Sequence, residues 1–303
     1  MTERVAVITG ANTGIGYHTA AQLARRGYTV VMACRSRERA DEARARLLAE
    51  VPGTQALVIR LDLAEPGSIQ AFRREFDDRL GVLDLLINNA GIVGVPLTRN
   101  SVGHELQLAT NYLGPFALTA ALLPSFRPDT PTRIVNVGSL AHRVAALRLD
   151  DFNWERRRYE PFRAYARSKL AMLAFTLELS RRLRRRGSDI TALCAHPGFA
   201  ATEIGRYNRL TNPRNPVGRW INERLRARIA TPQEASMPTV HAACAEDVRG
   251  GDYFGPGGWL EIGGPPAPAK LNPAARDEAL ARRLWELSQA MTGVRLLADD
   301  PPQ

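Results

Sequence analysis

Tyr165 and Lys169 are the pair of residues in this sequence whose types and spacing best suit proton transfer. Four residues apart on a helix, two side chains project from the same face with their Cβ atoms about 5–6 Å apart. A lysine ammonium beside a tyrosine hydroxyl favours the phenolate, so it lowers a phenol pKa that is ordinarily about 10. The spacing therefore predicts an acid–base unit that works near neutral pH.

The scarcity of lysine supports a chemical role for this pair. The chain has 41 Lys and Arg residues, yet only Lys169 and Lys270 are lysines. An ammonium is a compact charge with a tunable pKa, whereas a guanidinium stays protonated. The alternative is an ordinary solvated helix face, on which the same spacing is common. A cofactor site beside the pair would distinguish the two readings.

Composition excludes several classes of protein. The 303 residues contain 45% hydrophobic side chains but no uninterrupted apolar run of about 20 residues, so we expect no stable membrane insertion. An apolar strand begins almost directly after Met1, which leaves no room for a signal peptide and predicts a cytoplasmic protein. The three cysteines are too few and too widely spaced for a disulfide framework or a zinc site, so no metal is expected.

A net charge of +10 raises the question of nucleic-acid binding. The arginines are spread over many predicted helices and are mixed with acidic residues, and the run Arg181–Arg186 lies at a helix end, where cations complement the helix dipole. We therefore expect no nucleic-acid partner. A basic surface could instead attract anionic cofactors and substrates.

A strand, a glycine-rich turn and a helix are predicted at the start of the chain. The apolar run Val5–Ile8 leads into the turn, helical periodicity continues to Gly27, and a second apolar run, Tyr28–Ala33, follows. In such a loop the first glycine permits a tight turn, the second lets the backbone approach a pyrophosphate, and the third lets the helix pack closely. The predicted dinucleotide-binding loop comprises Gly10, Asn12, Thr13, Gly14, Ile15 and Gly16.

The residues that end the second strand predict which nicotinamide cofactor is bound. An acidic residue there accepts hydrogen bonds from the adenosine ribose and repels a 2′-phosphate, whereas arginine pairs with that phosphate. The sequence reads Cys34-Arg35-Ser36-Arg37, without an acidic residue. Arg35 therefore favours NADP(H), unless it merely belongs to the general arginine excess.

The alternation of apolar runs and helical patterns continues and predicts an α/β protein: a three-layer, doubly wound Rossmann fold with a central, mostly parallel sheet. No linker or repeat divides the chain, so we expect one domain over 1–303, with a core at 1–200, a substrate lid at 201–230 and a C-terminal part at 231–303. The further predicted strands are 55–61, 83–87, 133–137 and 190–195, and the further helices are 36–50, 68–80, 102–123, one ending near 186, 232–244 and 273–291.

Several residues follow directly after predicted strands, at the sheet edge where open α/β folds bind ligands. Asp62 and Leu63 are placed to meet the adenine, and Asn89, Ala90 and Gly91 let a ribose approach the backbone. The Ser139 hydroxyl, Pro197 and Gly198 reach the same edge. His196 could be a catalytic base, but a structural or cofactor-edge role is favoured.

Asn111 lies within the long helical pattern, where an asparagine is usually solvated or bonded back to the helix. Gly114-Pro115 follows and should bend that helix and free carbonyl groups near Asn111.

Together these motifs resemble the short-chain dehydrogenase/reductase family over roughly the first two thirds of the chain. They occur in the family's order: the glycine-rich turn from Thr9 to Gly16, Asn88–Gly91, Asn111, Ser139, Tyr165 with Lys169, and Pro197-Gly198.

Within the family, Ala33-Cys34-Arg35, Asn111–Phe116 and the long gap between Ser139 and Tyr165 resemble the retinol-dehydrogenase-like branch. That branch is mostly NADP-dependent and acts on apolar alcohols or carbonyls. We expect the chain to depart from it in lacking the N-terminal membrane anchor of many relatives, and it has Gly138 where a second serine is common.

The resemblance implies a role for each catalytic residue. Tyr165 would give a proton to a carbonyl oxygen during reduction, or take one from an alcohol, and Ser139 would hydrogen-bond that oxygen. Lys169 would hold the nicotinamide ribose and lower the tyrosine pKa, while Asn111 would position a water that links the lysine to solvent. Thr202, in the expected lid, would lie near the nicotinamide carboxamide.

The expected function is an NADP-dependent oxidoreductase that interconverts a carbonyl and an alcohol on an apolar small molecule. One alternative uses the bound cofactor for epimerisation, dehydration or cyclisation in secondary metabolism. Another is a non-catalytic NADP-binding sensor or scaffold, against which the complete catalytic set argues. Relatives commonly form homodimers or larger homo-oligomers through the helices carrying Asn111 and Tyr165, although the long C-terminal tail could cover those surfaces.

Overall fold

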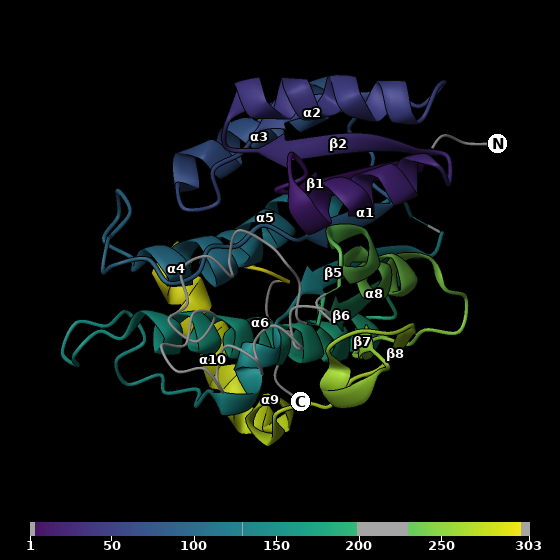
Figure 1. Cartoon of the computed structure of the whole chain (residues 1–303). Coiled ribbons are helices and arrows are strands. Elements are labelled where there is room, and N and C mark those ends of the chain that lie inside the picture. Colours follow the sequence, from purple (N-terminus) through teal and green to yellow (C-terminus); the bar gives the residue numbers. More distant parts are fainter. Residues whose placement is uncertain (1–3, 129, 199–229, 298–303) are drawn as a thin grey trace, which may run out of the picture.

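The computed structural model describes residues 4–128, 130–198 and 230–297, and their strands form one sheet of eight strands (Figure 1). The order is β3-β2-β1-β4-β5-β6-β7-β8, and every pair is parallel except β7 with β8. The predicted α/β fold with a mostly parallel sheet is confirmed. The strands are β1 (Arg4–Thr9), β2 (Tyr28–Cys34), β3 (Ala56–Arg60), β4 (Leu85–Asn88), β5 (Thr132–Val137), β6 (Ile190–Ala195), β7 (Tyr253–Pro256) and β8 (Pro266–Pro268).

The strand order reverses between β1 and β4, which lie side by side. In open α/β sheets such a switch point leaves a crevice at the carboxyl ends of the strands, because the connections leave toward opposite sides. Thr9 ends β1 and Asn88 ends β4. The glycine-rich turn and the Asn88–Gly91 segment are therefore brought to one crevice.

Helices cover both faces of the sheet, because side chains of each strand alternate between the faces. Val5 and Val7 of β1 belong to one hydrophobic core, and Ala6 and Ile8 belong to the other. The first core includes α3 (Pro66–Arg79), α5 (Gly114–Leu122) and α6 (Pro161–Arg185), and the second includes α1 (Gly14–Ala24), α2 (Arg37–Glu50) and α8 (Pro232–Cys244). None of the described helices is long and apolar enough to cross a membrane.

The predicted helical pattern over 102–123 is found over 106–122, but it is not one regular helix. Helical structure begins with the short α4 (Leu106–Leu108), passes through a π-helical turn (Ala109–Leu113), and continues as α5 from Gly114. Pro115 has no N–H to donate within a regular helix, which favours a wider turn just before it. Position 114 also requires glycine, since a Cβ there would lie 2.2 Å from the Leu63 carbonyl oxygen.

The C-terminal part also differs from its prediction. The expected helix over 273–291 is divided into α9 (Pro273–Arg276) and α10 (Glu278–Thr292), because Asp277 takes an extended conformation and its carboxylate caps α10 by accepting from Leu280 N. Strand β8 was not predicted, since two of its three residues are prolines. It lies at the edge of the sheet, the position in which prolines are tolerated.

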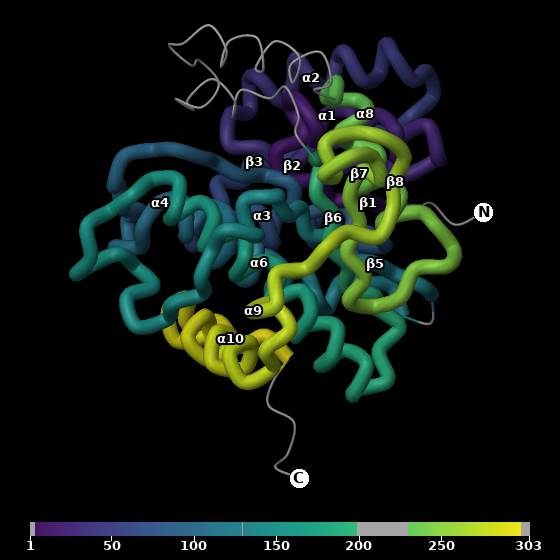
Figure 2. Tube along the Cα trace, turned by 60° about the horizontal axis from the view of Figure 1, so that its bottom comes forward, coloured from purple at the N-terminus to yellow at the C-terminus, as the bar shows by residue number. Residues whose placement is uncertain are grey.

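Helix α10 packs on the outer side of α6, as Figures 1 and 2 both show. Its Trp285 is 2% exposed and contacts the rings of Phe116 and Phe175, with centroids 5.5 and 5.7 Å away. The guanidinium carbon of Arg182 lies 4.4 Å from the centre of the Trp285 ring. The C-terminal helix therefore covers the helix that carries Tyr165.

We predict that Trp285→Ala lowers the free energy of unfolding by about 3–5 kcal/mol, because it leaves a cavity among the aromatic rings. Urea unfolding measures the change. The matched control is Trp259→Ala, which removes a side chain that is 69% exposed and should cost no more than about 0.5 kcal/mol. Equal losses in the two variants would contradict the docking of α10.

Candidate active site

Tyr165 and Lys169 both lie buried on α6, at the carboxyl edge of β5. Glu160 caps this helix by accepting from Phe162 N and Arg163 N, and Pro161 occupies its first turn. The Lys169 ammonium donates to the Val137 carbonyl oxygen at 2.9 Å, at the end of β5. The Tyr165 hydroxyl is hydrogen-bonded to Ser139, two residues after that strand. The helix and the strand end thus place the three polar groups together.

The pKa values differ from the sequence prediction in one respect. Burial raises the pKa of Tyr165 above its ordinary value, and the hydrogen bond with Ser139 opposes this shift only in part. The net shift is therefore opposite to the expected lowering, because desolvation of the phenolate dominates. Burial also lowers the pKa of Lys169 to about 8. Tyr165 is thus protonated at neutral pH and can act as a proton donor.

Asn111 is fully buried in the π-helical turn, which excludes the solvated alternative. Its Oδ1 accepts from Ile92 N at 2.8 Å, and its Nδ2 donates to the Ile92 carbonyl at 2.9 Å and to Ser168 Oγ at 3.0 Å. A Cβ on Gly91 would lie 3.3 Å from both Asn111 Oδ1 and Lys169 Nζ. Glycine at position 91 therefore leaves room at the point where these two side chains converge.

Ser139 begins a short 3₁₀ helix, Leu140–Val144, and its Oγ accepts from Ala141 N at 3.3 Å. Its carbonyl oxygen lies 2.6 Å from His142 Nδ1. These bonds order the turn that follows β5 and hold the serine hydroxyl beside Tyr165. Nothing in the sequence around His142 indicated that it would order this turn.

The glycine-rich turn has the shape of a phosphate cradle. Gly10 takes a φ of +67°, and a Cβ on Gly16 would lie 2.3 Å from the Gly10 carbonyl oxygen and 2.5 Å from Asn89 Nδ2. Gly14 takes a φ of +54°, and no atom lies within 4 Å of where its Cβ would be. Thr13 makes no side-chain cap on α1, so the first backbone N–H groups of this helix are free to bind an anion.

The cradle is joined to the end of β4 through Thr9. Asn89 donates from its backbone and side chain to Thr9 Oγ1 and the Thr9 carbonyl, at 2.9 and 2.8 Å, and Ala90 N also donates to Thr9 Oγ1. The asparagine side chains therefore tie the strand ends together, since Asn88 Nδ2 likewise donates to Asn136 Oδ1 at 2.8 Å. The residues present fit a dinucleotide at this crevice.

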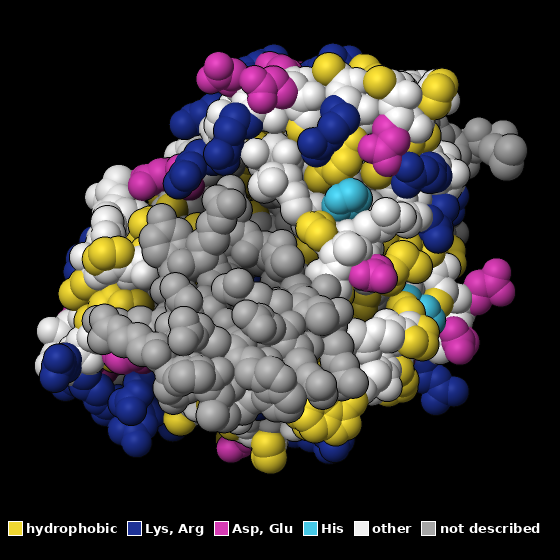
Figure 3. All heavy atoms as spheres, in the orientation of Figure 1, with side chains coloured by type: hydrophobic (Ala, Val, Ile, Leu, Met, Phe, Trp, Pro, Cys, Tyr) yellow, Lys and Arg dark blue, Asp and Glu magenta, His cyan; other side chains and the backbone are white. Residues whose placement is uncertain are grey.

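Arg35 is exposed at the end of β2. Arg39 and Arg46 of α2 line a cavity of about 200 Å³ together with Asn12, Thr13, Glu42 and Ala43. In Figure 3, Lys and Arg side chains are numerous over the region of α2 at the top of the view. No sequence pattern indicated Arg39 and Arg46, because only the fold turns this face of α2 toward the glycine-rich loop.

The two residues expected at the adenine differ in their surroundings. Asp62 is half-buried, and its Oδ1 accepts from Ala64 N at 3.0 Å. The Leu63 side chain is buried in the core, so only the backbone of Leu63 is left to meet a ligand. Their contact with adenine stays a prediction.

His196 is fully buried, and its two ring nitrogens are both engaged. Nδ1 accepts from Gly198 N at 3.1 Å, and Nε2 lies 2.8 Å from Glu261 Oε2. Burial lowers the pKa of His196 to about 4, while Glu261 opposes this shift. The histidine therefore orders the Pro197-Gly198 turn, as the favoured structural reading predicts, and is not a free base.

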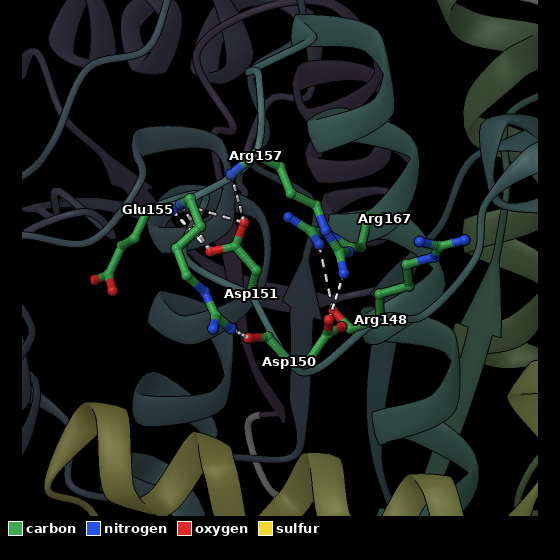
Figure 4. Close-up of polar contacts among 7 residues, drawn as sticks. Arg148, Asp150, Asp151, Glu155, Arg157 and Arg167 are labelled. Carbon is green, nitrogen blue, oxygen red and sulfur yellow. Dashed lines mark hydrogen bonds and ion pairs between the residues drawn. The ribbon is translucent and has the colours of Figure 1, made fainter.

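The segment 141–162, which we call the insertion because it fills the long gap between Ser139 and Tyr165, is attached to α6 through Arg167, which is buried two residues after Tyr165 (Figure 4). Its guanidinium donates to the carbonyls of Arg148 and Phe152 and lies 4.2 Å from the centre of the Trp154 ring. The Asp151 carboxylate accepts from the backbone of 155–157 and closes the same loop. The insertion is thus held beside the catalytic helix. Thr202 and the expected lid lie outside the described residues, apart from Ala230.

Comparisons with known proteins agree with this arrangement. The short chain dehydrogenase family model matches residues 4–213. Retinol dehydrogenase 13 of Mus musculus is 37% identical over 300 residues, which cover 98% of this chain and 86% of that protein.

Two solved structures are similar as well. That of an uncharacterized protein from Mycobacterium paratuberculosis superposes with a TM-score of 0.79 at 37% identity, covering 97% of this chain and 95% of that one. A blue fluorescent protein from a metagenomic library in complex with NADPH has a TM-score of 0.61 at 28% identity, covering 82% of this chain and 94% of that one. The chain therefore belongs to the short-chain dehydrogenase/reductase family and is an oxidoreductase related to the retinol dehydrogenases.

Proposed function

We propose that the protein is an NADP-dependent oxidoreductase that interconverts a carbonyl and an alcohol on an apolar small molecule, with Tyr165 as the general acid and base. The convergence of Tyr165, Ser139 and Lys169 at the carboxyl edge of β5 supports this most strongly. A substrate oxygen that meets both hydroxyls would find two hydrogen-bond donors already in place. Such preorganised donors stabilise a developing alkoxide without reorganisation during the reaction.

The nicotinamide cofactor would supply or accept the hydride, and the glycine-rich turn with the N-terminus of α1 would hold its phosphates. In reduction, Tyr165 gives its proton to the carbonyl oxygen while Ser139 donates a hydrogen bond to the same oxygen. Lys169 carries the positive charge that stabilises the tyrosinate formed by this transfer. In alcohol oxidation the same groups act in the reverse order.

Apolar side chains at the border of the site support an apolar substrate. Phe162 is part-exposed at the start of α6, and its ring lies 6.4 Å from that of Tyr165. Val144, at the end of the turn that begins with Ser139, is also exposed. The name of the retinol dehydrogenase relatives points to substrates of this kind. Thr202 is proposed to lie near the nicotinamide carboxamide.

NADP(H) is proposed over NAD(H) because Arg35 is exposed at the end of β2 and Arg39 lines the cavity beside the glycine-rich loop. We propose that the 2′-phosphate of NADP would bind beside these two guanidinium groups. Paired with that phosphate, a guanidinium would contribute charge-assisted hydrogen bonds.

We predict that NADPH binds at least about 10-fold more tightly than NADH, and that Arg35→Ala removes most of this difference by weakening NADPH alone. Fluorescence titration of the purified protein measures both dissociation constants. Arg37→Ala is the matched control, since Arg37 is exposed and pairs with Asp41 on its own helix. Equal affinities for the two cofactors in the unaltered protein would refute the preference.

We predict that Tyr165→Phe lowers kcat about 100-fold or more, because it removes the proton donor while keeping the ring. NADPH oxidation with a panel of aldehydes and ketones, followed by absorbance, measures turnover. Net consumption of NADPH also separates this reaction from an epimerisation or dehydration. Tyr28→Phe is the control, since its hydroxyl lies beside Arg4 on another part of the sheet. Undiminished turnover in Tyr165→Phe would exclude the proposed acid.

We predict that the rate of carbonyl reduction falls as the pH rises through about 8, because Lys169 then loses its charge. Below that pH both Lys169 and Tyr165 are protonated, so the rate should form a plateau. A profile of kcat between about pH 6 and pH 10 measures this decrease in rate. A rate that stays level across this interval would show that the charge of Lys169 is not required.

A further inference from the structure

Glu261 connects two segments of the candidate site although it lies far from both in the sequence. Its Oε2 lies 2.8 Å from His196 Nε2, next to the Pro197-Gly198 turn. Its Oε1 lies 2.5 Å from Arg143 Nη2 and 3.1 Å from Lys270 N. The Glu261 side chain is only 14% exposed, so these contacts are largely shielded from water.

The bond between Glu261 and His196 has a defined direction. His196 Nδ1 accepts the backbone N–H of Gly198, so this nitrogen carries no proton. The proton of the neutral ring must then be on Nε2, which donates to the Glu261 carboxylate. A Cβ on Gly198 would lie 2.8 Å from the Glu261 carbonyl oxygen, so the two backbones also touch. Glu261 thus holds the Pro197-Gly198 turn through both its side chain and its main chain.

Through its Oε1 atom, the Glu261 carboxylate also contacts the turn that begins with Ser139. Arg143 lies in the 3₁₀ helix that begins after Ser139, and its guanidinium forms the ion pair with Glu261. The preceding residue, His142, contacts the Ser139 carbonyl through Nδ1. One carboxylate therefore restrains both the serine turn after β5 and the proline–glycine turn after β6.

The backbone at Glu261 is held in an unfavourable conformation. Leu260 and Glu261 have φ values of +53° and +58°, and neither is a glycine. Residues with a Cβ adopt this left-handed conformation rarely, and it persists where the surroundings determine it. The Leu260 side chain is 58% exposed. The restraint comes from the contacts of the Glu261 carboxylate together with the backbone bonds from Glu261 N to the Gly258 carbonyl and from Ile262 N to the Trp259 carbonyl.

We propose that Glu261 is a positioning residue that sets the placement of Ser139 relative to the Pro197-Gly198 turn. The proposal rests on the function proposed above, in which Ser139 binds the substrate oxygen, and on the prediction that the Pro197-Gly198 turn lies at the cofactor-binding edge of the sheet. Hydride transfer requires both partners to be held at close approach, and a displacement of about 1 Å can cost about 100-fold in rate. Glu261 contacts neither partner and acts through His196 and Arg143.

Steady-state kinetics of Glu261→Ala and Glu261→Gln test this proposal. We expect Glu261→Ala to lower kcat about 100-fold with little change in the KM of the carbonyl substrate. Glu261→Gln has nearly the same volume and can still accept from His196, but it loses the charge that faces Arg143, so its loss should be smaller. Glu278→Ala, a matched control on the exposed surface of α10, should leave kcat unchanged. An undiminished kcat in both Glu261 variants, or equal losses in the control, would overturn the proposal.

Two further measurements do not require turnover. In ¹⁵N NMR spectra, His196 should have Nε2 protonated and Nδ1 unprotonated, and Glu261→Ala should remove this preference while the thermal unfolding midpoint stays close to that of the unaltered protein. The same variant should bind NADPH more weakly in a fluorescence titration. An unchanged His196 spectrum and an unchanged NADPH affinity would overturn the proposal even if no carbonyl substrate were reduced. Failure of the unaltered protein on every carbonyl, with these two shifts present, would refute only the proposed reaction.

Discussion

The buried ammonium of Lys169 is the interaction on which the arrangement of the site depends. It donates to the Val137 carbonyl at the end of β5 and so joins the catalytic helix to the sheet at one point. Helix α6 positions Tyr165 and the end of β5 positions Ser139, so the two hydroxyls come together. A charge without solvent is costly, so burial lowers the pKa of Lys169 to about 8. The same burial that orders the lysine makes its charge sensitive to pH.

The parts of the chain outside the family's motifs hold this arrangement in place. Helix α10 presses Trp285 against the aromatic side chains of α5 and α6, so the C-terminal segment stabilises the helix that carries Tyr165. Glu261, also C-terminal, contacts residues beside both Ser139 and Gly198. Arg167 binds the insertion to α6. Helix α6 is therefore supported by two segments that are remote from each other in sequence, and Glu261 supports the turns after β5 and β6.

Local patterns predicted most elements and missed those that depend on distant contacts. Periodicity and the glycine-rich turn indicated β1, α1 and β2, because each requires only neighbouring residues. Gly114-Pro115 indicated a distortion near Asn111, but the π-helical form was not foreseen, since the close contact of Gly114 with Leu63 is made only in the fold. The raised pKa of Tyr165 was also missed, because burial is a property of the packed molecule.

The sequence by itself determined the α/β class, the cofactor cradle and the Tyr165–Lys169 pair, because backbone conformation at glycines and side-chain direction on a helix are local properties. Only the tertiary structure decided what surrounds that pair. Asn111 became a buried partner of Ile92, and Arg39 came to face the glycine-rich loop. Glu261 became the connection between two turns. Such contacts depend on which strand ends the fold brings together, and the spacing of residues along the chain does not encode their distances in space.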